Sequence, residues 1–147
     1  MKAGFVSIAG EPNVGKSTLL NRLIGSKLAG ISKKPGTTRK VIHGILTEPR
    51  GQVVFLDTPG LHKPKDLIGR SMIRQAVGTF LGADLLYFLI EPKISERMDL
   101  TVFHSFREKG KPIFCVINKT DIISKPEILP VIHWHRNQQL FQEFIPI

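Results

Sequence analysis

The stretch AGFVSIAGEPNVGKSTLLN, residues 3–21, joins an apolar run to a turn that contains two glycines, a lysine and a serine. Residues 5–9 are almost wholly apolar and predict a buried strand. Residues 16–24 carry apolar side chains at spacings of three and four, which is typical of a helix. The turn between them matches the phosphate-binding pattern G-x-x-x-x-G-K-[ST], whose fixed positions are Gly10, Gly15, Lys16 and Ser17.

Each fixed position of this turn has a physical reason. Glycine lets the backbone wrap closely around an anion with its N–H groups pointing inward, and the start of the helix adds positive potential. Lys16 brings a full charge to the terminal phosphates, and Ser17 offers a hydroxyl to Mg²⁺. An ordinary glycine-containing turn, the alternative, requires neither the preceding strand nor the lysine and serine at these positions.

The rest of the chain alternates apolar runs with stretches of helical spacing. Strands are predicted at residues 41–46, 53–56, 85–90, 113–117 and 144–147, and helices at 68–81, 96–109 and 128–140. The pattern predicts an α/β fold of the P-loop NTPase type, a three-layer sandwich around a mostly parallel six-stranded sheet. Because only the short turn EPRG separates the second and third strands, we expect that pair to be antiparallel.

Composition limits the classes of protein. The 147 residues suit one domain, and an apolar content of 41% with 22% charged residues is ordinary for a globular protein. No apolar run approaches the roughly 20 residues that cross a bilayer, and no secretion signal is evident, so a cytoplasmic location is expected. The net charge of +9 favours polyanions, although the basic residues form no continuous tract. Cys115, the single cysteine, is predicted to be buried and inert.

The tetrapeptide NKTD, residues 118–121, follows an apolar strand and predicts which base is bound. Guanine presents two adjacent N–H donors that one carboxylate accepts, and adenine has no donor at N1, so Asp121 selects guanine. Asn118 is expected to tie this loop to the phosphate loop, and the Lys119 stem to pack on the purine face.

Two segments between these motifs predict a nucleotide-dependent switch. Asp57 in DTPG, residues 57–60, is expected to support the Mg²⁺ shell, while the Gly60 N–H meets the γ-phosphate. The loop KPGTTR supplies a threonine to the metal, Thr38 by preference over Thr37. Loops held by the γ-phosphate and released on hydrolysis make a two-state element.

These motifs together resemble the Era GTPases, a bacterial and organellar group. The resemblance rests on GEPNVGKSTLLN, KPGTTRKVIHGILT, VVFLDTPGLHKPKDLIGRSM and NKTD, and it covers essentially the whole chain. Many GTPases share the four motifs, but HKPK followed by LIGRSM points to Era over the Der and tRNA-modifying relatives.

The resemblance implies a GTP-hydrolysing switch that acts with 16S rRNA in assembly of the small ribosomal subunit. Catalysis is expected to involve Lys16, Thr38, Gly60 and Asn13, with Mg²⁺ held by Ser17, Thr38 and Asp57. Nucleotide contacts are expected from Glu11, Pro12, Asn13, Val14, Gly15, Lys16, Ser17, Thr18, Asp57, Thr58, Pro59, Gly60, Leu61, Asn118, Lys119, Thr120 and Asp121. Family members continue past the last strand into a Ser-Ala loop, a helix and an RNA-binding KH domain. Residues 1–147 are therefore expected to form an incomplete GTP-binding domain without that helix and KH domain.

Several expectations stay open at this point. Leu61 stands where related GTPases carry a water-orienting glutamine, and relatives without it bind K⁺ through an asparagine that matches Asn13; the alternative is that Asn13 only stabilises the turn. We expect a monomer, with peripheral contact at the inner membrane as a further option. His62 is read as a solvated loop residue, and HWH, residues 133–135, as surface around a packed Trp134. Two other functions compete: a nucleotide-binding fragment with negligible turnover, and a basic RNA-binding module.

Overall fold

The computed structural model describes residues 2–11, 13–25, 42–57, 78, 82–94 and 101–147. In chain order its elements are β1 (Lys2–Gly10), α1 (Lys16–Ile24), β2 (Ile42–Glu48), β3 (Gly51–Asp57), β4 (Leu85–Ile90), α3 (Thr101–Glu108), β5 (Ile113–Ile117), η1 (Thr120–Ile122), α4 (Lys125–Arg136) and β6 (Glu143–Pro146). Apart from Gly78, the helix predicted at residues 68–81 lies outside the described residues, as does the start of the one predicted at 96–109.

The six strands form one sheet in the order β2-β3-β1-β4-β5-β6. Strand β2 runs antiparallel to β3, whereas the other neighbouring pairs are parallel. Glu48 pairs with Gly51 across the hairpin, so Pro49 and Arg50 make the turn. The predicted sheet and its antiparallel strand are therefore confirmed.

Strand β1 begins earlier than its apolar run predicts. Lys2 and Ala3 are exposed, and they join the strand because they pair with Gly51 and Gln52 of β3. Ladder hydrogen bonds to a neighbouring strand do not depend on side-chain polarity, so the apolar pattern marks only the buried part of β1.

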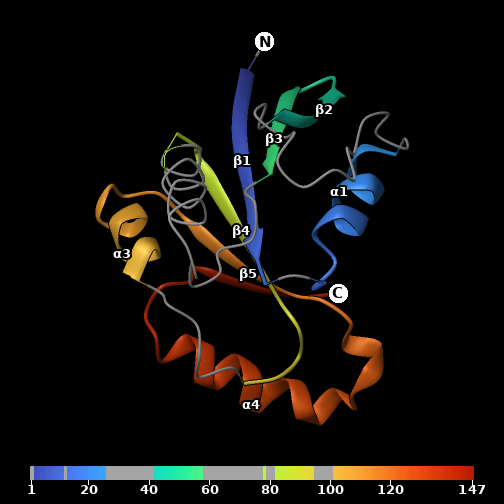
Figure 1. Ribbon diagram of the computed structural model, residues 1–147, viewed down its shortest axis with the longest axis vertical. Helices are drawn as coiled ribbons and strands as arrows, with labels where there is room; N and C mark the ends of the chain where they lie inside the picture. The colour runs from blue at the N-terminus through green and yellow to red at the C-terminus, as the bar shows by residue number, and fades with distance from the viewer. Residues whose placement is uncertain (1, 12, 26–41, 58–77, 79–81, 95–100) are drawn as a thin grey trace, which may run out of the picture.

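Helices cover both faces of the sheet. On one face Ala9, Phe88 and Cys115 pack with Phe103 of α3 and Val131 of α4, and the rings of Phe88 and Phe103 meet edge to face at 4.8 Å. On the other face Val6, Ile8, Phe55, Leu89 and Val116 pack with Leu20 of α1. Figure 1 shows α1 and α3 on opposite sides of the strands. This arrangement is the predicted three-layer sandwich.

Helix α4 spans Lys125–Arg136, so the predicted range 128–140 was wrong at both ends: the helix starts earlier and stops earlier. Its start is a capping box, in which Ser124 and Glu127 satisfy each other's backbone N–H groups, and Pro126 lies in the first turn. Beyond its end, Gln139 has a left-handed φ of 56°, which a right-handed helix cannot include. The apolar spacing continued to Leu140, because Leu140 is buried in the following loop.

The HWH segment also differs from its surface interpretation. His135 is fully buried, and its Nδ1 lies 2.8 Å from the carbonyl oxygen of Val131, one turn earlier in α4. Desolvation lowers the pKa of His135, which keeps the ring neutral. His133, two positions away on the helix, is exposed as expected.

Cys115 is buried in the centre of β5, as predicted. Desolvation raises the pKa of its thiol to about 12, so it stays protonated and unreactive at neutral pH. None of the helices in the part of the chain that the structure describes has the length and apolar character needed to span a bilayer.

Replacing Phe106 tests the α3 side of the core. Its ring is fully buried, so Phe106→Ala leaves a cavity and should lower the free energy of unfolding by about 3–5 kcal/mol. Leu129→Ala, on α4 at 67% exposure, is the matched control and should change it by less than about 0.5 kcal/mol. Urea denaturation followed by circular dichroism measures both. Equal effects of the two substitutions would contradict the assigned core.

Candidate nucleotide-binding site

The phosphate loop lies between the end of β1 and the start of α1. Gly15 precedes the helix with a left-handed φ of 102°, and Asn13 also has a positive φ of 62°. No side chain caps the start of α1, and its first turn contains no acidic residue. The first N–H groups of the helix and its positive end therefore suit an anion, which is the chemistry that a phosphate requires.

The ammonium group of Lys16 is held over this loop. Its Nζ donates to the carbonyl oxygen of Gly10 at 2.8 Å and to that of Glu11 at 2.7 Å. Two backbone acceptors at the entrance of the loop thus fix where the positive charge lies. Ser17 and Thr18 follow in the first turn of α1 and are exposed.

The predicted contact between the base loop and the phosphate loop is present. The side-chain amide of Asn118 donates to the carbonyl oxygen of Val14 at 2.8 Å. The next residue, Lys119, donates from Nζ to the carbonyl oxygen of Asn13, also at 2.8 Å. These two bonds join segments that lie far apart in the chain.

The position of Gly15 depends on the same contact. A Cβ atom built on Gly15 would overlap the amide nitrogen of Asn118. A side chain here would also be strained by the positive φ. The second glycine of the pattern thus leaves room for the base loop, in addition to shaping the turn.

Residues 5–119 match the family of 50S ribosome-binding GTPases. The chain belongs to this family of GTPases. A GTPase Era from Ruminiclostridium cellulolyticum is 42% identical over 147 residues, which cover 99% of this chain and 49% of that protein. The GTPase chain thus spans about half the length of the curated relatives it matches.

Two solved Era structures have the same fold as this GTPase chain. Aquifex aeolicus Era bound to GDP and AlF₄⁻ superposes with a TM-score of 0.81 at 41% identity, over 100% of this chain and 51% of that one. Era in complex with MgGDPNP and a segment of 16S ribosomal RNA gives 0.80 at 41% identity, with the same coverage. The recognition of an Era-type GTPase domain from the sequence is therefore confirmed.

Part of the predicted GTPase site lies outside the described residues: Pro12, Thr37, Thr38, Thr58, Pro59, Gly60, Leu61 and His62. Asp57 ends β3, where its backbone pairs with Ile8 of β1. This pairing brings the end of β3 beside the strand that leads into the phosphate loop. Thr120 and Asp121 lie in η1, and Thr120 donates from its N–H and its hydroxyl to the carbonyl oxygen of Ile147.

Glu91 is a site residue that sequence reasoning missed. One carboxylate oxygen lies 2.7 Å from Lys119 Nζ, and the other lies 2.8 Å from Lys93 Nζ. Hydrogen bonds from Lys119 and then Lys93 are the main causes that lower the pKa of Glu91 to about 2. The available signal was its position directly after β4, at the edge of the sheet where parallel strands end.

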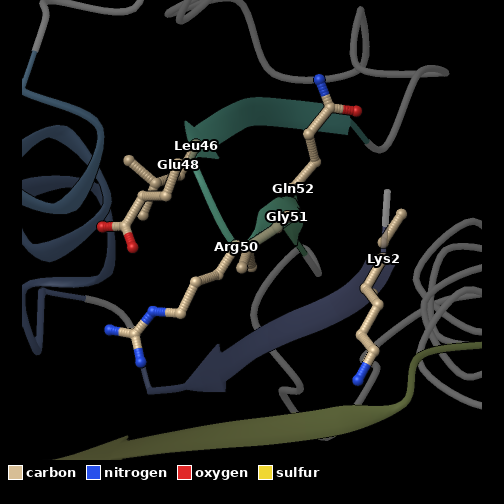
Figure 2. A pocket seen from close by; sticks show the side chains of 9 residues that line it. Lys2, Leu46, Glu48, Arg50, Gly51 and Gln52 are labelled. Carbon is tan, nitrogen blue, oxygen red and sulfur yellow. The ribbon is translucent and has the colours of Figure 1, made fainter.

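A pocket of about 400 Å³ lies at the opposite edge of the sheet, beside the start of β1 and the β2–β3 hairpin (Figure 2). Figure 2 shows the charged ends of Lys2 and Arg50 well separated, with the Glu48 carboxylate on the Arg50 side. The 9 residues of β1 place it on the order of 25 Å from the phosphate loop. A pocket with mixed charge at the amino ends of parallel strands is a poorer nucleotide site than the motif-lined carboxyl edge.

Gly15→Ala tests the link between the two loops. The alanine forces Asn118 away from Val14 and is strained at φ 102°, so we expect a loss of about 2–4 kcal/mol in the free energy of unfolding. Gly25→Ala is the matched control, because Gly25 has φ 71° but nothing lies within 4 Å of the place that an added Cβ would take. It should cost only about 1–2 kcal/mol. Urea denaturation without nucleotide measures both, and equal losses would refute the steric link.

Proposed function

We propose that this chain binds GTP and GDP and hydrolyses GTP as a molecular switch. The observation that carries the proposal is that two hydrogen bonds join the base loop to the phosphate loop. Asn118 donates to the carbonyl oxygen of Val14, and Lys119 donates to that of Asn13. One nucleoside phosphate could occupy both loops at once. The match to GTPases along the chain favours hydrolysis over a fragment with negligible turnover and over a basic RNA-binding module.

The proposal assigns a role to the residues of the phosphate loop and of the base loop. Lys16 and the N–H groups at the start of α1 bind the β- and γ-phosphates and stabilise the charge that develops during transfer. Asp121 accepts the two guanine donors, and the Lys119 stem covers the purine face. These contacts orient the phosphates without forming a covalent intermediate.

Mg²⁺, when bound, would supply positive charge that offsets the negative charge of the phosphates. Ser17, Thr38 and Asp57 are its proposed ligands, with Thr37 as the less favoured threonine. Mg²⁺ keeps several waters and needs few protein ligands. The described residues contain no cluster of three or more His, Cys, Asp and Glu side chains. A Mg²⁺ site with these few protein ligands does not require such a cluster. The Era structure with MgGDPNP supports the same choice of metal.

We propose further that the switch acts with 16S rRNA in small-subunit assembly. The Era complex that contains nucleotides of 16S ribosomal RNA supports this partner, as does the net charge of +9. Binding of the chain to that RNA segment, measured with GTP and with GDP at two salt concentrations, tests the role. Equal RNA affinity with GTP and with GDP would support a basic RNA-binding module instead.

Asp121→Asn tests the assignment of guanine. Xanthine replaces the 2-amino donor with a carbonyl, which an amide can meet, so the variant should lose GDP affinity and gain affinity for xanthosine diphosphate. Calorimetric titration of both ligands measures the exchange. Lys16→Ala is the control for the phosphates and should nearly abolish binding of either nucleotide. An unchanged preference for guanine in Asp121→Asn would remove the base assignment.

Asn13 and Leu61 lead to a prediction about cations. If Asn13 helps to hold K⁺ beside the phosphates, GTP hydrolysis should be slow and faster in K⁺ than in Na⁺ at matched ionic strength. Asn13→Ala should remove that difference, because a methyl group cannot ligate a cation. Single-turnover hydrolysis with Mg²⁺ gives the rates. Equal rates of the parent chain in the two salts reject the cation role.

A further inference from the structure

We propose that Glu91 is a positioning residue for Lys119, and that it sets the affinity for the purine ring of any bound nucleotide. This inference rests on the proposed function, since it concerns the same base loop. Glu91 lies outside every motif that predicted the site, and its role follows from its contacts alone.

Glu91 comes directly after β4, and the end of that strand is bonded to the base loop. The N–H of Asn118 donates to the carbonyl oxygen of Ile90 at 2.9 Å, which fixes the backbone of Glu91 beside the loop. The Glu91 side chain is 24% exposed and that of Lys119 37% exposed, so both are partly shielded from water. A carboxylate attached to a strand end is a well-defined anchor for a neighbouring loop.

Lys119 is held at two points by different elements. Its Nζ lies 2.7 Å from Glu91 Oε1 and 2.8 Å from the carbonyl oxygen of Asn13. One bond would leave a flexible four-carbon stem free to rotate about the acceptor, whereas two acceptors on different segments restrict its path. Because Glu91 carries a charge, its bond is the stronger of the two kinds. The stem is thereby ordered before a purine packs on it.

Lys93 contacts Glu91 without sharing this role. It bonds to the other carboxylate oxygen, Oε2, and its side chain is 60% exposed. Such an exposed ion pair contributes little to stability. Glu11 of the phosphate loop attracts Lys93 by charge, but this attraction is the weakest of the causes that raise the pKa of Lys93, behind its hydrogen bond and charge attraction to Glu91. Removing Lys93 therefore leaves the bond between Glu91 and Lys119 in place, which makes it the matched control.

The carboxylate stays ionised under ordinary conditions. Its pKa is lowered from 4.5 to about 2, so its contribution is fully present above the unfolded value and is lost only as the pH falls towards 2. Glu91 is thus a constant part of the base loop between pH 5 and 8, and it cannot act there as a pH switch.

The expected signature follows from the part of the nucleotide that Lys119 covers. The purine face is common to GDP and inosine diphosphate, whereas the 2-amino group that Asp121 reads is present only in GDP. Glu91→Ala should therefore weaken both ligands by the same factor, about three- to tenfold, and leave their ratio unchanged. Glu91→Gln keeps an acceptor but no charge, and it should recover part of the loss.

The experiment is a double-mutant cycle on nucleotide affinity. Calorimetric titration of GDP and inosine diphosphate is carried out on the parent chain, Glu91→Ala, Glu91→Gln, Lys93→Ala, Lys119→Ala and the double variant Glu91→Ala with Lys119→Ala. Lys93→Ala should bind like the parent. Once Lys119 is absent, Glu91→Ala should have no further effect, because its action passes through that side chain.

The outcomes separate this inference from the proposed function. Two results overturn the positioning role while the parent chain still binds GDP. One is that Glu91→Ala binds both nucleotides as tightly as the parent. The other is that Glu91→Ala weakens nucleotide binding by the same factor whether Lys119 is present or replaced by alanine. A change in the ratio of GDP to inosine diphosphate also overturns it, since Glu91 would then act on the guanine edge. Failure of the parent chain to bind either nucleotide overturns the proposed function, and the inference with it.

Discussion

The hydrogen bond from the Asn118 side chain to the carbonyl oxygen of Val14 is the contact on which the site depends. It joins a loop after β5 to a loop after β1, so neither can take its position without the other. Gly15 must lack a Cβ for Asn118 to approach, which makes the phosphate pattern and the base loop two parts of one steric constraint. The two motifs are therefore coupled by direct packing.

The strand order brings the phosphate loop and the base loop close together. Strand β4 lies between β1 and β5, and Leu89 pairs with Gly10 on one side and with Val116 on the other. The carboxyl ends of three parallel strands thus lie side by side, and they deliver the phosphate loop, Glu91 and Asn118 to one edge. A site of this kind needs no long loop to bring its parts together, because the register of the sheet already does so.

Sequence patterns predicted the parts of this protein that follow from local chemistry. The phosphate loop, α1 and β4 were predictable because fixed residue types and apolar spacing recur over short distances. The extension of β1 to Lys2 and the ion pair of Glu91 with Lys119 were not, because each depends on a partner distant in the chain. The burial of His135 against Trp134 and Phe141 was missed for a different reason, because a histidine does not count in an apolar pattern. The start of α4 was missed for another reason: the capping residues Ser124 and Glu127 carried a local signal that the apolar spacing obscured.

The described contacts also limit where a switch can reside. In the proposed complex Lys119, Asn118 and Asp121 would meet the base, which is identical in GTP and GDP, so they would contribute equally to both complexes. A ligand shifts a conformational equilibrium only through interactions that differ between the two states. The difference must therefore come from groups that meet the γ-phosphate, for which Thr38 and Gly60 are the candidates. Under the proposed function the base loop would supply affinity and specificity, and the switch would require a second set of residues acting on the third phosphate.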